Sequence, residues 1–310
     1  QKYASQGLGG LHRRYLEHSH REAAAEMNDI QRYFVEQTRL GIPVLMNTEG
    51  LRGVKGKNMT VFPSAIGLGS TWDEEMFERI YAAVALEARC LGMHQVFSPN
   101  LDIVRDPRWG RTGENFGEDP YLTSRLGVAF IKAVQGDGSL IDDRHVAATA
   151  KHYAVHGQPV GGINTAPGNI SRGEILNYFL PPFEAAVREA GVKLVMASYN
   201  EVDGIPVHAH RWLLQDVLRD RFGFKGVTMS DYHAITRMIS DHFTAATRTE
   251  AAFKAMTGGV DVELSEPPRY TYPTLVEQVR SGIIPERILD ESVRRILRLK
   301  FETGLFENPY

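Results

Sequence analysis

The sequence predicts an α/β protein built as a (β/α)8 barrel of the TIM type, in which the first strands are irregular or missing. Short apolar runs of strand length recur along the 310 residues, and each is followed by a longer segment with helical spacing. This alternation is typical of βα units around a parallel sheet. No G-x-G-x-x-G follows any of the runs. Its absence disfavours the competing open, doubly wound sheet of a dinucleotide-binding protein.

Six strands are predicted, each as a continuous apolar run of the kind that is buried on both faces. They cover residues 42–46, 96–98, 146–150, 194–198, 227–230 and 260–264. No element is predicted before residue 42, and residues 1–10 look like a processed or trimmed end. A single barrel commonly uses about 250 residues, so we expect one domain over residues 1–310.

Three helix starts are predicted between these strands. Thr71 to Glu74 fits a capping box, and the apolar residues that follow recur on one face of a helix. Asp119-Pro120 fits an N-cap followed by proline in the first turn. Pro285 opens a basic terminal helix whose predicted inward side chains are Leu289, Val293, Ile296 and Leu297.

Composition and charge narrow the class of partner. The formal net charge is −3, from 35 basic and 38 acidic side chains, so no strong field attracts nucleic acid or an anionic membrane. No apolar run approaches the roughly 18 residues that span a bilayer. His208 and His210 lack a third ligand at a recognisable spacing, so we expect no metal site, and we expect no organic cofactor. A neutral small molecule is the expected partner.

Polar residues follow five of the predicted strands, and in parallel barrels the chemistry lies at these strand ends. Alone, each residue has a simple structural explanation: Asp231 could form a turn, and Arg111 could pair with Glu114 or Glu118 to order its loop. Together they offer carboxylates that accept hydrogen bonds from sugar hydroxyls and cations that donate to them. The strand-end residues are Glu49, Arg52, Arg111, Lys151, His152, Tyr199 and Asp231.

Five ordered motifs extend this pattern along the chain. They are Arg108-Trp-Gly-Arg111 through Gly117-Glu-Asp-Pro120, Ala150-Lys-His-Tyr153, Met196-Ala-Ser-Tyr-Asn200, Gly226-Val-Thr-Met-Ser-Asp231 and Gly304-Leu-Phe-Glu-Asn-Pro-Tyr310. With these motifs the chain resembles the N-terminal barrel domain of glycoside hydrolase family 3. The resemblance implies that Asp231 is the catalytic nucleophile. It also implies a sugar pocket formed by Glu49, Arg52, Arg111, Lys151, His152, Tyr199 and Tyr232.

The implied activity is that of a retaining exo-β-glycosidase. Such an enzyme removes a terminal β-D-glucosyl or β-D-xylosyl residue from an oligosaccharide or an aryl or alkyl glycoside, through a covalent glycosyl-aspartate. Glu49 stands where β-glucosidases of the family commonly have Asp, and Glu is more typical of xylosidase-like members. Tyr232 replaces a Trp that often follows the nucleophile, so a changed subsite is expected. Members that resemble this chain are often periplasmic or secreted, although cytoplasmic members occur.

The general acid is the part that the resemblance does not assign. Many members take it from a downstream α/β domain, which this chain lacks, so a partner domain is expected. A branch of the family uses a His-Asp pair after the Lys-His motif, but His156-Gly157 here is followed by Gln158-Pro159.

Two other functions fit the strand-end residues alone. One is a Schiff-base aldolase in which Lys151 attacks a carbonyl. The other is a barrel that binds sugars but has no turnover without its partner domain.

Overall fold

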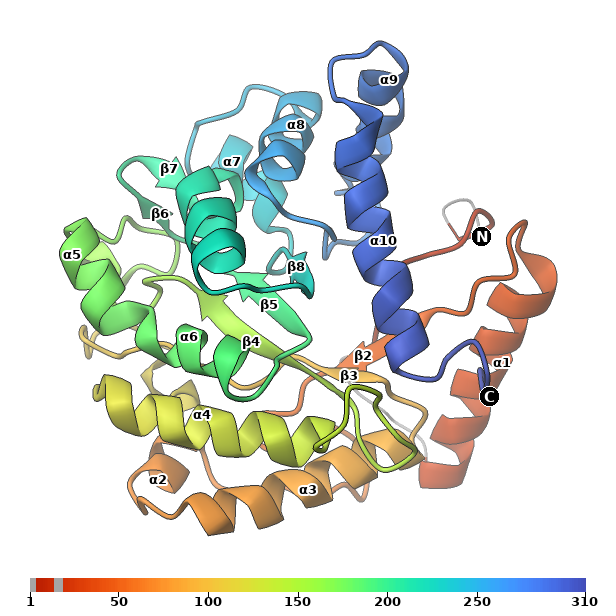
Figure 1. The fold of residues 1–310 in the computed structure, drawn as a ribbon, viewed down its shortest axis with the longest axis horizontal. Helices are drawn as coiled ribbons and strands as arrows, with labels where there is room; N and C mark the ends of the chain where they lie inside the picture. Colours follow the sequence, from red (N-terminus) through yellow and green to blue (C-terminus); the bar gives the residue numbers. More distant parts are fainter. Residues whose placement is uncertain (1–3, 14–18) are drawn as a thin grey trace.

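The computed structural model describes residues 4–13 and 19–310, so residues 1–3 of the predicted trimmed end lie outside the described part. A curved sheet of six parallel strands occupies the centre, and helices cover its outer face (Figure 1). The order is β1-β2-β3-β4-β5-β8. The bounds are β1 (Gly10–His12), β2 (Leu45–Thr48), β3 (Gln95–Val96), β4 (Ala147–Tyr153), β5 (Leu194–Ala197) and β8 (Val227–Met229). The predicted α/β barrel-type architecture is confirmed.

Five of the six predicted strands belong to this sheet, and the sixth forms only the start of a strand. Residues 260–264 contribute a single bridge, between Met229 and Val262. Main-chain hydrogen bonds still tie the segment to β8 and the residues after it: the Asp261 amide donates to the Thr228 carbonyl, and the Ser230 amide donates to the Val262 carbonyl, each at 2.8 Å. The Asp261 side chain adds to this, because it accepts from Arg219 and Arg295, each at 2.7 Å, and from Ser292 at 2.8 Å. A separate hairpin, β6 (Glu201–Val202) with β7 (Ile205–Pro206), follows β5. The last strand position is therefore held by main-chain and side-chain hydrogen bonds together.

Two elements that the apolar runs do not identify precede residue 42, in keeping with the expectation that the first strands are irregular. Strand β1 contains too few apolar residues to form a run, and it exists because Gly10 to His12 pair in register with Leu45 to Asn47. Helix α1 (His20–Gln37) buries Ala23, Met27, Gln31 and Phe34 on one face, a helical spacing interrupted by the polar Gln31. Gln31 exchanges two hydrogen bonds with the Val44 main chain, which explains why it is buried.

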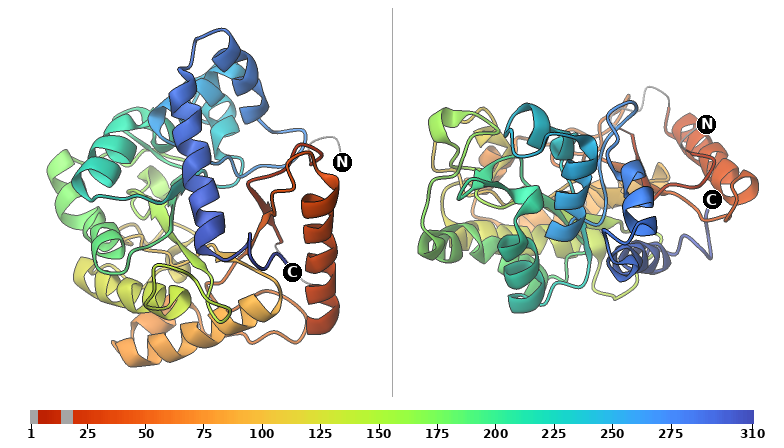
Figure 2. Two further views of the ribbon diagram at one scale, coloured as in Figure 1. Left: turned by 45° about the vertical axis from the view of Figure 1, so that its right-hand side comes forward. Right: turned by 90° about the horizontal axis from the view of Figure 1, so that it is seen from above.

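The remaining helices connect the strands on the outside of the sheet, as the two further views in Figure 2 show. They are α2 (Ala65–Gly69), α3 (Glu74–Cys90), α4 (Pro120–Gln135), α5 (Arg172–Glu174), α6 (Pro181–Arg188), α7 (Ala234–Ser240), α8 (Arg248–Gly258), α9 (Leu275–Arg280) and α10 (Glu286–Glu302). Two π-helical segments are η3 (Ile175–Phe179) and η5 (Trp212–Arg221), and short 3-10 helical turns are η1 (Thr112–Glu114), η2 (Val160–Gly162), η4 (Val207–Ala209) and η6 (Tyr272–Thr274). Within the described ranges, no helix combines the length and apolar character needed to cross a membrane.

Two of the three predicted helix starts are confirmed. The Asp119 side chain accepts from the Leu122 amide with Pro120 in the first turn, and Pro285 directly precedes α10. The capping box at Thr71 is wrong: Asp73 caps α3 and accepts from the Met76 amide at 2.9 Å. The Thr71 hydroxyl donates instead to the Leu68 carbonyl, because it belongs to the turn that ends α2.

The inward face predicted for α10 is confirmed only in part. Leu289 and Ile296 are half-buried and pack against buried core residues, but Val293 is 46% exposed, and Leu299 and Lys300 are the buried residues near the end of the helix. The helix is turned because the Lys300 ammonium donates to the Leu8 and Pro43 carbonyls and Ser292 donates to Asp261. The predicted apolar stripe lines an open groove beside residues 6–9.

Candidate active site

Asp231 lies two residues after β8, where its carboxylate is only 10% exposed. The Ser230 amide still donates to the Val262 carbonyl, so the main chain remains tied to the sheet up to this point. The Tyr232 amide donates to Asp231 Oδ1 at 2.6 Å. Asp231 Oδ2 has no hydrogen-bond partner among the described residues and lies 3.5 Å from His152 Nε2. One carboxylate oxygen is therefore fixed and the other is free to react.

Opposing effects set the charge of Asp231. Burial raises the pKa of its carboxyl above the ordinary value, while the positive charges of Arg111 and Lys151 oppose that shift without cancelling it. The hydrogen bond from the Tyr232 amide and the nearby Tyr199 hydroxyl also act to lower the pKa, and the net direction is still upward. The cations expected to favour an ionised Asp231 are thus present, but burial has the larger effect on its pKa.

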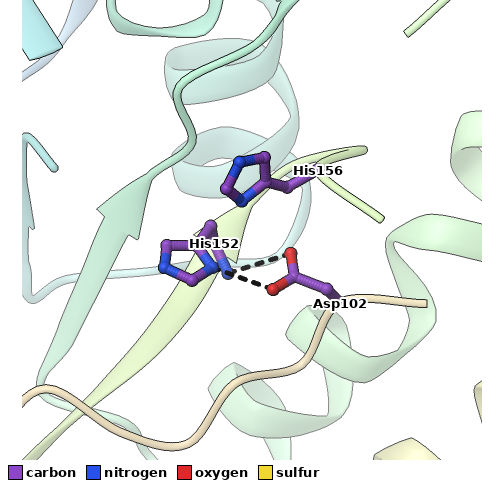
Figure 3. A group of neighbouring side chains, drawn as sticks. All are labelled: Asp102, His152 and His156. Atoms are coloured by element: carbon purple, nitrogen blue, oxygen red, sulfur yellow. Dashed lines mark hydrogen bonds and ion pairs between the residues drawn. The ribbon is translucent and has the colours of Figure 1, made fainter. Parts of the chain in front are cut away.

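His152 lies between Asp231 and a second buried carboxylate, Asp102. Its Nδ1 is 2.8 Å from Asp102 Oδ2, and its backbone amide donates to Asp102 Oδ1 at 3.2 Å (Figure 3). Burial, followed by the charge of Arg111, holds the pKa of His152 well below its usual range, so its ring is neutral. With the proton on Nδ1, Nε2 accepts a hydrogen bond from Arg111 Nη2 at 2.9 Å.

Arg111 connects this group to its own loop. Its guanidinium donates to both carboxylate oxygens of Glu114, at 3.0 and 2.8 Å, as well as contacting His152. The pairing of Arg111 with Glu114, one of the two structural explanations offered for this residue, is confirmed. A bidentate pair fixes the plane of the guanidinium, so the Arg111 N–H groups keep a defined orientation toward His152.

Glu49 and Lys151 form the opposite rim of the site. Lys151 Nζ donates to Glu49 Oε2 at 3.1 Å; Lys151 lies within β4, and Glu49 directly follows β2. Burial acts to raise the pKa of Glu49, but the charges of Lys151, His12 and Lys55 together outweigh it, so the pKa is lowered. Glu49 is therefore an ionised hydrogen-bond acceptor.

The two predicted tyrosines are tied to the segment around Asp231 and to the loop beside it. The Tyr199 hydroxyl donates to the Tyr232 carbonyl at 2.9 Å, and the Arg237 guanidinium lies 4.9 Å above the Tyr199 ring. The Tyr232 hydroxyl donates to Glu266 at 2.9 Å. The hydroxyl that distinguishes Tyr232 from Trp thus anchors the ring to the loop after residue 264.

Arg52 is the predicted pocket residue that the structure does not bring to Glu49. Its side chain is exposed and its Nε donates to the Phe62 carbonyl at 3.4 Å. The residue follows β2 by four positions, and the chain has by then turned away from the strand end.

His156 lies behind His152 and is fully buried, with the two ring centroids 4.7 Å apart (Figure 3). Together with Asp102 they form a group of potential metal ligands whose atoms all lie within 4.8 Å of one another. A metal there would have to displace the Asp102–His152 hydrogen bond, and His156 Nε2 is already 3.2 Å from the Asn164 carbonyl. The geometry fits a hydrogen-bonded pair better than a metal site.

Three residues of the site were missed by the sequence predictions: Asp102, Glu114 and His208. Asp102 could have been found, because it follows a predicted strand by a few residues, as Glu49 and Asp231 do. Glu114 was named only as a loop partner. His208 accepts from the Asp231 amide at 3.2 Å across 23 residues of sequence, and no local pattern indicates that contact.

The comparisons with known proteins decide the family. The family model described as "Glycosyl hydrolase family 3 N terminal domain" matches residues 3–299. The chain belongs to glycosyl hydrolase family 3. A putative β-xylosidase of Formosa agariphila is 42% identical over 296 residues, which is 95% of this chain and 39% of that protein. The periplasmic β-glucosidase of Salmonella typhimurium is 36% identical over 92% of this chain and 36% of its own length.

Solved structures of family 3 proteins share the fold. A β-glucosidase from Erythrobacter marinus superposes with a TM-score of 0.96 at 38% identity, covering 99% of this chain and 41% of that chain. The chain therefore spans between 36% and 41% of the length of these three relatives. The family resemblance is confirmed.

The Schiff-base aldolase is not supported. An aldolase lysine needs a neutral amine with a free lone pair, whereas Lys151 is ion-paired with Glu49 and only 5% exposed. The family 3 match gives no support to an aldolase either.

Proposed function

We propose that this chain is the nucleophile-bearing domain of a retaining exo-β-glycosidase that removes terminal β-D-glucosyl or β-D-xylosyl residues. The observation that carries the proposal is the buried carboxylate of Asp231, with Oδ1 held by a main-chain amide and Oδ2 unbonded. Arg111, Lys151 and the neutral His152 surround it, as a nucleophile that must be ionised requires.

The proposed reaction has two displacements. Asp231 Oδ2 forms a bond to the anomeric carbon while the bond to the aglycone oxygen breaks, and that oxygen takes its electron pair and a proton from a general acid. Water then attacks the same carbon, and Asp231 leaves as a carboxylate with net retention. Arg111 and Lys151 lower the energy of the carboxylate in its free and departing states.

We propose that the general acid comes from a further α/β domain of the protein. The relatives are more than twice as long as the matched region, which supports a partner domain. The alternative is a general acid within this chain, and Glu266, which accepts a hydrogen bond from the Tyr232 hydroxyl, is the carboxyl group to test for that role. Glu266→Gln is expected to leave hydrolysis of natural glycosides largely intact.

We also propose that Glu49 and Lys151 select the terminal sugar. The extra methylene of Glu relative to Asp extends the carboxylate toward the space of a hydroxymethyl arm, which favours a pentose. The named relatives include both a putative xylosidase and a glucosidase, so both sugars belong in the test. A periplasmic or secreted location is proposed from the periplasmic relative.

Trapping the intermediate tests the proposal. The protein is treated with 2-deoxy-2-fluoro-β-D-glucosyl and -xylosyl fluorides, whose leaving group needs little acid assistance, and the peptides are mapped by mass spectrometry. We expect one adduct, on Asp231, and none in the Asp231→Asn variant. Attachment to another residue contradicts the nucleophile assignment. Saccharide binding without any adduct supports the sugar-binding alternative, and relative labelling rates rank the two sugars.

A further inference from the structure

We propose that His208 is a positioning residue for the nucleophile: its imidazole holds the main chain of Asp231 and thereby directs the free carboxylate oxygen. This inference rests on the proposed function. After β8 the main chain remains hydrogen-bonded on one side, because the Ser230 and His233 amides donate to the carbonyls of Val262 and Leu264.

The Asp231 amide has no strand carbonyl available on the opposite side. The pairing of β5 with β8 ends at Met196 and Met229, and beyond it the Ser198 amide pairs with the Tyr153 carbonyl of β4. His208 Nε2 takes the place of the absent carbonyl and accepts from the Asp231 amide at 3.2 Å. Because His208 is 1% exposed, water cannot replace it.

This contact requires a neutral imidazole with its proton on Nδ1. Burial, assisted by the nearby His242, lowers the pKa of His208 to about 3. The ring therefore keeps a lone pair on Nε2 at neutral pH, and the acceptor is present under working conditions.

His208 acts together with Tyr199, which lies on the same segment between β5 and η5. Both flank the β6–β7 hairpin, and the Val207 amide donates to the Asn200 carbonyl to close it. The Tyr199 hydroxyl donates to the Tyr232 carbonyl, and His208 accepts from the Asp231 amide, so one segment makes hydrogen bonds to Asp231 and to the residue after it. The Tyr232 amide then fixes Oδ1, which leaves Oδ2 directed into the site.

His210 provides a matched control two residues away. It is 4% exposed, and neither ring nitrogen has a partner among the described residues. Removing the His210 ring therefore perturbs the same segment without removing a contact to Asp231.

The experiment compares His208→Leu, His208→Gln and His210→Leu. The amide oxygen of Gln can occupy the place of Nε2, whereas Leu has no acceptor. The readouts are the rate constant of Asp231 labelling by 2-deoxy-2-fluoro-β-D-glucosyl fluoride and the calorimetric Kd for glucose. Because small displacements of a reacting group cost rate rather than ground-state binding, we expect about 10- to 100-fold slower labelling for His208→Leu, with Kd changed less than about twofold. His208→Gln and His210→Leu are expected to label within about threefold of wild type.

Wild-type labelling rates in His208→Leu overturn the inference and leave the proposed function standing. Equal loss in the Gln and Leu variants, with His210→Leu unaffected, also overturns it, since the acceptor would then be irrelevant. Failure of the wild-type protein to label at Asp231 is a failure of the proposed function instead. If His208→Leu does not fold, His208→Asn replaces it, because its shorter side chain leaves the Asp231 amide unpaired; slower labelling than His208→Gln supports the inference and equal labelling overturns it.

Discussion

The two rims of the candidate site are built in different ways. On one rim Asp231 is held by its own main chain, by His208 and by the Tyr232 amide, and the buried Asp102 and His152 lie beside it with the half-buried Arg111. On the other rim Glu49 is 28% exposed at its side chain and is held by the ion pair with the buried Lys151. If the proposed function holds, bond cleavage rests on the more deeply buried contacts around Asp231, and sugar selection rests on Glu49, which is more open to solvent.

Removing the nucleophile is the strongest test of the buried rim. Asp231→Gly is expected to lower hydrolysis of natural glycosides by about 10⁴-fold or more, the scale of losing a group that acts only in the reaction. Turnover is measured on aryl and natural glycosides, with circular dichroism as the check on folding. Azide added to the variant should occupy the vacated space and yield an α-glycosyl azide. Substantial residual hydrolysis without azide would count against Asp231.

The contact behind His152 should matter next. In Asp102→Asn one acceptor oxygen is replaced by a donor, which turns the His152 ring to the tautomer with its proton facing Arg111. Two donors would then meet, so we expect kcat to fall about 100-fold, with KM changed less than about threefold. Steady-state kinetics separate the two constants. A change confined to KM would place Asp102 in binding rather than in positioning.

The rim formed by Glu49 and Lys151 should control the choice of sugar more than the rate of bond cleavage. Glu49→Asp is expected to shift the xyloside-to-glucoside ratio of kcat/KM toward glucose by about tenfold, within the range that one methylene contributes to discrimination. Paired 4-nitrophenyl substrates measure the ratio. Arg52→Ala is the matched control, because Arg52 is exposed and contacts the Phe62 carbonyl. An equal shift in both variants would show that the ratio reflects the loop and not the Glu49 carboxylate.

The smallest expected effect is on stability. Burial raises the pKa of Asp231 in the folded protein, while in the unfolded chain the carboxyl titrates at its ordinary value. Ionised Asp231 therefore destabilises the fold above its raised pKa, and the effect disappears below the ordinary value, where both states are protonated. Asp231→Asn should melt at a higher temperature than wild type at pH 7, and the difference should vanish as the pH falls below about 4. A lower melting temperature at pH 7 would show that attraction to Arg111 and Lys151 outweighs burial.

The strands that could be predicted are those that are buried on both faces. Residues 146–150 and 194–198 have continuous apolar runs because helices pack on one side of the sheet and the barrel interior on the other. Strand β1 could not be predicted, since three residues containing Gly10 and His12 carry no such run and depend on pairing with β2. The face of α10 was predicted only in part for a related reason: Lys300, which is polar, is buried there and donates to the Pro43 carbonyl.

The sequence by itself determined the βα alternation, the family and the residues at the strand ends. Each of these depends on residues that are adjacent in sequence: an apolar run forms the buried strand, and polar residues follow it directly. Tertiary structure decided how those residues are paired. Lys151 meets Glu49 across 102 positions, His152 meets Asp102 across 50, and His208 meets Asp231 across 23. Hydrogen bonds of this kind depend on which strand ends adjoin and in what register. That is why Asp231 was predicted, whereas the partners that leave its Oδ2 free were found only in the folded chain.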